Sequence, residues 1–140
     1  MKRKERDRFD ALFEEVLEAL PAPLHDLIEQ APLIVEDHPD PKLLAELGMD
    51  PENESLCGLH TGVPLTERSV SDAHEPPVMI HIFREGIIDE AGGWERWQDE
   101  DDQWCGGDEA IREEIRITVL HEIGHHFGLE EEDLEALGYE

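Results

Sequence analysis

The sequence predicts a small α+β domain, because two segments have the periodicity of helices and a third has the alternation of a strand. Residues Arg6 to Leu20 repeat apolar side chains at helical spacing. Residues Val78 to Arg84 alternate, with Val78, Ile80 and Ile82 facing one way, which is typical of a strand. Residues Asp108 to Phe127 are apolar around most of their circumference, which predicts a central, buried helix.

Shorter elements are expected between these three segments, where apolar runs are broken by Pro and Gly. Trp94 and Trp97 are three residues apart, which suits one face of a short helix packed on the core. The acidic run Asp99 to Asp102 is expected to be a solvated surface loop. The remaining short elements are a helical turn at Leu24–Glu29, a strand at Pro32–Glu36, a helix at Lys42–Leu47, a strand at Leu56–Gly62 and a helix at Glu131–Leu137.

Length and charge restrict the organisation and the partners of the chain. At 140 residues it can build one core but not two, so we expect a single domain over residues 1–140. The formal net charge of −26 repels nucleic-acid phosphates and anionic membrane surfaces. We therefore expect neither nucleic acid nor membrane as a partner, and a basic peptide or protein fits best. The oligomeric state is not predicted.

The chain lacks the features of an exported or membrane protein. Its basic N-terminal segment has no uninterrupted apolar core, and no run approaches the roughly 18 apolar residues of a membrane span. We expect a cytoplasmic protein. Cys57 and Cys105 lie far apart and form no C-x-x-C pair, so free thiols are expected, with a disulfide between them as the alternative.

The stretch HEIGHHF, which starts at His121, has the spacing of a metal site. His121 and His125 are four residues apart, so a helix places both imidazoles on one face, about 40° apart around its axis. Both can then reach one Zn²⁺ at ~2.1 Å. Glu122 lies about 100° further round, beside the ion, where a general base for a water molecule is needed.

The third metal ligand is predicted in the short segment that follows the helix. Gly128 can adopt a positive φ and turn the chain back towards the metal. Glu131 then stands where the pattern H-E-x-x-H-x-x-G-x-x-H has its third His. A solvated acid within the run EEED is the alternative for Glu131.

At these residues the sequence resembles the minimal zincin-like metallopeptidases of bacteria, over roughly residues 8 to 138. The resemblance implies a small α+β zincin, with a small mixed sheet on the HExxH helix and helices at both ends. It also implies a metal held by His121, His125 and an acid at Glu131. The segment Asp89 to Gly107 is longer and more charged than the family leads us to expect. The motifs that carry the resemblance are HEIGHHFGLEEEDLEALG, GLHTGVPLTERSV (Gly58 to Val70) and VMIHIFRE (Val78 to Glu85).

These features predict a zinc-dependent metallopeptidase, with Glu122 as general base and a peptide or protein as substrate. The strand Val78 to Arg84, or its neighbour, is the candidate shelf for an extended peptide. One alternative is a non-catalytic metal-binding module with a structural zinc. Another is a metal-dependent endoribonuclease with the same ligand spacing, although Glu122 and the net charge of −26 count against it.

Overall fold

The computed structural model of the chain describes residues 1–46, 48, 57–61, 79–130 and 132–133. Helices and strands are mixed in these residues, so the predicted α+β class is confirmed. In chain order the elements are α1 (Arg3–Ala19), α2 (Ala22–Gln30), β1 (Leu33–Glu36), α3 (Pro41–Glu46), β2 (Gly58–Thr61), β3 (Met79–Phe83), α4 (Arg84–Ala91), β4 (Trp97–Gln98), β5 (Trp104–Cys105) and α5 (Gly107–Phe127).

The larger sheet has three strands in the order β1-β3-β2. Strand β1 pairs with β3 in parallel, with Leu33 opposite Ile80, and β2 pairs with β3 antiparallel, with Gly58 opposite Ile82. The sheet is therefore mixed, as expected. The predicted strand at Val78–Arg84 is its central strand, and Ile80 and Ile82 are fully buried on it.

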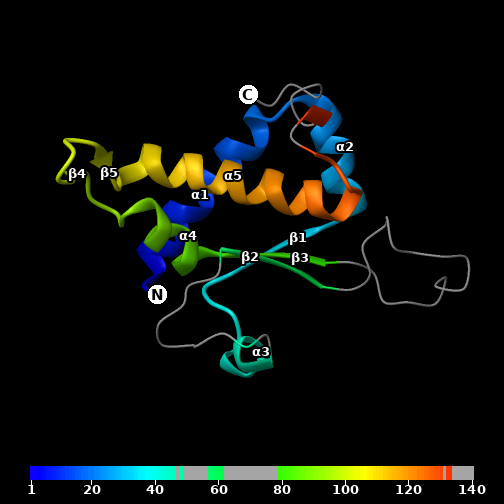
Figure 1. Cartoon of the computed structure of the whole chain (residues 1–140), viewed down its shortest axis with the longest axis horizontal. Coiled ribbons are helices and arrows are strands. Elements are labelled where there is room, and N and C mark those ends of the chain that lie inside the picture. The colour runs from blue at the N-terminus through cyan, green and yellow to red at the C-terminus, as the bar shows by residue number, and fades with distance from the viewer. Residues whose placement is uncertain (47, 49–56, 62–78, 131, 134–140) are drawn as a thin grey trace, which may run out of the picture.

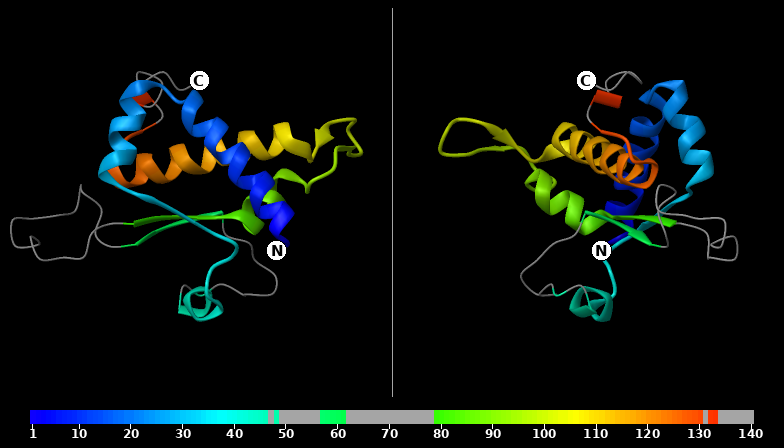
Figure 2. Two further views of the ribbon diagram at one scale, coloured as in Figure 1. Left: turned by 180° about the vertical axis from the view of Figure 1, so that it is seen from behind. Right: turned by 45° about the vertical axis from the view of Figure 1, so that its right-hand side comes forward.

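Helix α5 is the element around which the fold is packed. It contacts α1, α4, β2 and β3, and Figures 1 and 2 show it on one side of the three-stranded sheet with α3 on the other. Among the described residues, no helix is long and apolar enough to cross a membrane. The fully buried side chains of α5 recur at helical spacing along one face. That buried face consists of Ile111, Ile115, Val119, Leu120 and Ile123.

Two expectations about apolar side chains are wrong. Ile117 was expected among the apolar residues of a central, buried helix, but its side chain is 39% exposed, so α5 has an open face there. Trp97 was expected on a short helix packed on the core, but it lies on β4, which pairs with β5 in a hairpin, and is 46% exposed. The free thiols are confirmed for Cys57 and Cys105.

An ion-pair network joins α1 to the end of β1 and the start of α4. The Asp37 carboxylate accepts hydrogen bonds from Arg6 Nε at 2.8 Å and from Arg84 Nη1 at 2.9 Å. Arg84 Nε also donates to Asp10 Oδ1 of α1 at 3.0 Å. The hydrogen bonds from Arg6 and, next, Arg84 lower the pKa of Asp37, against an opposing effect of burial.

This lowered pKa gives a stability prediction. Because the folded state holds Asp37 ionised, its contribution is present above the unfolded-state pKa of about 3.9 and is lost as the pH falls through the lower folded-state value. We expect Asp37→Asn to lower the free energy of unfolding by about 1 to 3 kcal/mol near neutral pH. The difference in the free energy of unfolding between the parent and Asp37→Asn should become smaller as the pH falls. Urea titrations over a pH series measure it, with exposed Asp26→Asn as the control, and an equal loss in both variants would contradict the role.

Candidate metal centre

The predicted metal-binding histidines lie on the open face of α5. His121 and His125 are one turn apart, and both are exposed, while the residues on the opposite face pack against the sheet and α1. Helix α5 ends at Gly128, which has φ 66°. The backbone amides of Gly128 and Leu129 both donate to the carbonyl of Gly124, so the chain leaves the helix axis directly after the histidines.

Glu122 points away from the open face, towards strand β2. A Cβ atom added at Gly58 would lie 3.0 Å from Glu122 Cγ and 3.1 Å from Oε1, so the absence of a side chain at Gly58 leaves room for this carboxyl group. Burial raises the pKa of Glu122, and the neighbouring His121 and His125 oppose that effect. The carboxyl group is therefore held at the boundary between the sheet and the histidine face.

Two further residues, Thr118 on α5 and Cys57 in the preceding position, lie next to Gly58. Thr118 is buried one turn before Glu122, and its Cγ2 would lie 3.1 Å from a Cβ at Gly58. Burial, and next the charges of Glu90 and Glu114, raise the pKa of Cys57 to about 11, while a hydrogen bond with Thr118 opposes them. Burial therefore favours the protonated thiol of Cys57, which is a poor nucleophile.

The other histidines of the described residues have different surroundings. His126, next to His125, is buried and its ring meets Phe127 edge to face at 4.5 Å. On β3, His81 Nδ1 is 2.7 Å from the Glu36 carboxylate of β1. His81 therefore belongs to the sheet. The side chain of His60 and the whole of His74 lie outside what the structure describes.

The predicted third ligand, Glu131, lies outside the described residues and stays a prediction. No group of three His, Cys, Asp or Glu residues able to hold a metal occurs within the part of the chain that the structure describes. Among its neighbours, Asp133 accepts a hydrogen bond from the amide of Glu130 at 2.9 Å, so this carboxylate is already used in a turn. The imidazoles of His121 and His125 are donors that suit Zn²⁺.

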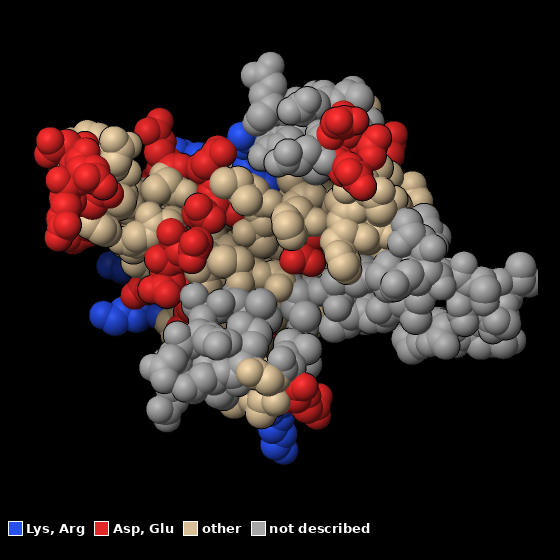
Figure 3. Space-filling view, in the orientation of Figure 1, with Lys and Arg blue, Asp and Glu red and all other residues tan. Residues whose placement is uncertain are grey.

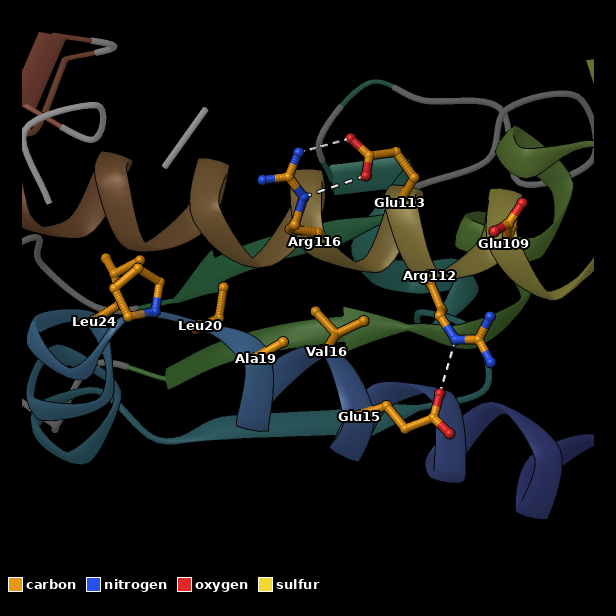
Figure 4. Close-up of a pocket in the computed structure, with 10 residues that line it drawn as sticks. Glu15, Val16, Ala19, Leu20, Leu24, Glu109, Arg112, Glu113 and Arg116 are labelled. Atoms are coloured by element: carbon orange, nitrogen blue, oxygen red, sulfur yellow. Dashed lines mark hydrogen bonds and ion pairs between the residues drawn. The ribbon is translucent and has the colours of Figure 1, made fainter. Parts of the chain in front are cut away.

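A cavity of about 310 Å³ lies between α1, α2 and α5 (Figure 4). Apolar residues such as Val16 and Leu24 line it, and Arg112 at its rim donates to Glu15 at 2.7 Å. The lining includes neither histidine of the predicted site. The cavity is therefore separate from the metal centre.

Negative charge accumulates on α4 and on the part of α5 that precedes the histidines. Burial, and next the charge of Glu90 on α4, raise the pKa of Glu114 on α5. Figure 3 shows acidic side chains over the visible face of the molecule, with few basic ones. A cationic group approaching this face would meet a favourable potential.

The roles of Gly58 and Thr118 were not predicted. Spacing within one helix identifies His121, Glu122 and His125, but the strand that faces Glu122 is more than 50 residues away in sequence. The one available signal was a Gly within a short strand, which often marks a close approach by another group.

Comparison with known proteins identifies the family of the chain. The sequence profile of one family, described as zincin-like metallopeptidase, matches residues 28–139. The chain belongs to the zincin-like metallopeptidase family. Membership supports a peptidase that uses zinc and acts on a peptide or protein substrate. A comparison with curated proteins gave no match.

The first prediction for the site concerns the metal itself. We expect the protein to bind one Zn²⁺, and His121→Ala combined with His125→Ala to abolish that binding, because two of its donors are removed. Elemental analysis after dialysis measures the zinc content. His25→Ala, an exposed His on α2, is the matched control. Equal zinc in the double variant and the parent would contradict the site.

The second prediction concerns Glu131. We expect Glu131→Ala to weaken zinc binding by well over ~10-fold, the effect typical of a residue that only supports a ligand. Glu130→Ala and Glu132→Ala should change it little. Competition titrations with a zinc chelator give the affinities. If Glu130, Glu132 or Asp133 proves more important than Glu131, the predicted ligand set is wrong.

Proposed function

We propose that this protein hydrolyses peptide bonds, with His121, His125 and Glu131 holding zinc and Glu122 acting as general base. The observation that carries the proposal is that the side chains of the motif on α5 point in two different directions. The two imidazoles face the open side, while Glu122 is half-buried against Gly58 at the sheet edge. A base that stands beside an ion without occupying its coordination sphere needs this arrangement.

Zinc, when bound, would polarise the carbonyl of the scissile bond and make a water molecule more acidic. Glu122 would take the proton from the attacking water and hold it on a carboxylate oxygen. The same carboxyl group can then return that proton to the amine that leaves. Contact with β2 limits the freedom of the Glu122 side chain, so the carboxylate is positioned before the substrate arrives.

The pairing of the strands decides which of them has an open edge for an extended substrate peptide. Strand β3 is paired on both sides, by β1 and β2, so it has no open edge for a peptide. Its neighbour β2 is an edge strand in the part of the chain described, and its first residue, Gly58, adjoins Glu122. An extended peptide paired with β2 would therefore run past the general base. The charges of Glu90 and Glu114 favour a peptide with basic residues.

The alternative of a non-catalytic module with a structural zinc needs a closed set of four protein ligands. Instead, His121 and His125 are both exposed on α5, which suits a site with an open position for water and substrate. The endoribonuclease alternative is opposed by the acidic surface, since RNA-binding sites neutralise phosphates with Lys and Arg. Hydrolysis of peptides remains the activity that the site supports best.

A substitution at Glu122 tests the proposed mechanism. Glu122→Gln keeps the size of the side chain but cannot take up the proton, so we expect zinc content to be unchanged and turnover to fall by ~10²- to 10⁴-fold. Glu109→Gln, at an exposed acid in the first turn of α5, is the matched control and should retain turnover. Hydrolysis of a library of quenched fluorescent peptides measures both.

Two results would count against this role. Full turnover by Glu122→Gln would show that another group takes the proton. A parent protein that binds zinc but cleaves no peptide in the library would favour the non-catalytic module.

A further inference from the structure

The hairpin formed by β4 and β5 lies outside the proposed catalytic machinery. It precedes α5 and projects from the body of the molecule (Figure 1). Helix α5 begins at Gly107, fourteen residues before His121, which places the hairpin about 20 Å along the helix axis from the metal centre. An interaction made by the hairpin can therefore be separated experimentally from the peptidase site.

The tip of the hairpin has a defined conformation. Asp99 donates its amide to the carbonyl of Gln103 at 3.0 Å, and Asp102 adopts φ 61°, the left-handed conformation expected in a three-residue hairpin loop. The Asp99 carboxylate accepts from the amides of Asp101 and Gln103, both at 2.9 Å. These bonds fix the loop, so its charged groups are presented without the cost of ordering a flexible segment.

The base of the hairpin is also fixed to the body. Trp97 Nε1 donates to the carbonyl of Gly92 at 2.8 Å, and the amide of Gly106 donates to Ala91 at 2.8 Å. Gly106 has φ 71°, and a side chain there would collide with the carbonyl of Glu95. The close approach between the segments at Gly106 and Glu95 therefore requires glycine at residue 106.

The surface of the hairpin combines exposed indole rings with unbalanced negative charge. Trp104 is 59% exposed and Trp97 46% exposed. Residues 95–105 contain five acidic side chains and one base, Arg96. Figure 3 shows acidic side chains gathered at this end of the molecule. Glu100 and Asp101 are exposed, and their carboxylates form no ion pair within the residues that the structure describes.

Arginine side chains already occupy the indole faces in this region. The Arg96 guanidinium lies 4.2 Å from the centre of the Trp104 ring, although five carboxylates are nearby in sequence. Arg8 lies 4.7 Å from the centre of the Trp94 ring, and its Nη2 is 2.6 Å from the Asp108 carboxylate. The second arrangement shows how an indole and a carboxylate together hold one guanidinium.

We propose that the hairpin is a docking surface for an arginine-bearing segment of a partner protein. Arg96 covers one face of Trp104, and the exposure of the ring leaves the other face for a guanidinium of the partner. Glu100 and Asp101 supply the carboxylates that pair with it, as Asp108 does for Arg8. Arginine fits better than lysine because its planar group stacks on a ring while it donates to a carboxylate. The proposal does not depend on peptidase activity.

The test uses the full-length protein and a synthetic eight-residue peptide of alternating Arg and Ser, with a Gln-for-Arg version as the negative probe. Calorimetry at about 50 mM and about 500 mM salt gives the affinities, because pairing between exposed charges weakens as salt rises. We expect Trp104→Ala to weaken binding about tenfold, since the stacking surface is lost. Glu100→Gln with Asp101→Asn should weaken it several-fold at low salt. Glu14→Gln with Glu18→Gln, the same charge change on α1, should alter it less than about twofold.

Arg96→Gln gives a result in the opposite direction. Gln retains the methylenes that lie beside Gly107 but removes a positive charge that repels the peptide and uncovers the second face of the Trp104 ring. We therefore expect the peptide to bind about threefold more tightly. Circular dichroism and melting curves confirm that each variant is folded. Unchanged binding in Trp104→Ala would overturn the proposal, as would an equal loss in the Glu14 and Glu18 control. Binding to zwitterionic lipid vesicles but not to the peptide would overturn it in favour of a membrane surface.

Discussion

The close approach of α5 to strand β2 is the contact on which the rest of the site depends. Gly58 has no side chain, and the side chains of Glu122 and Thr118 fill the space that a Cβ atom would need. A larger residue there would push the strand and the helix apart or displace Glu122. The same contact fixes the rotation of α5, because Thr118 and Glu122 lie one turn apart along one line of the helix. The orientation of the histidines follows from that rotation.

The rotation of α5 places its packed residues on one face and the predicted metal-binding histidines on the other. One face carries the fully buried Ile111, Ile115 and Val119 against the rest of the fold, and it supplies most of the apolar burial of the helix. The opposite face carries polar groups, and the described residues leave Ile117 on it 39% exposed. His121 and His125 are therefore accessible to a metal ion and to a substrate, whereas His126, on the packed side, is buried. A single helix thus supports the core and presents the site.

Sequence reasoning succeeded where the signal lies within one element. The period of α5 and the spacing of His121 and His125 depend only on helix geometry, and Gly128 indicated where the helix ends. It failed where distant segments meet. The exposure of Ile117 depends on which neighbours cover α5, and the pairing of Trp97 in a hairpin competes with a helical spacing that looked equally good. Gly58 could not be assigned, because its role comes from Glu122, far away in the chain.

The central claim is that this helix presents an open, catalytic zinc site. X-ray absorption spectroscopy of the zinc-loaded protein tests it most directly, because the number and type of atoms bound to the ion distinguish a catalytic site from a structural one. We predict a shell of two imidazole nitrogens and oxygen donors, from which addition of a small hydroxamate displaces solvent. A shell closed by a fourth protein ligand and unchanged by the hydroxamate would contradict the account.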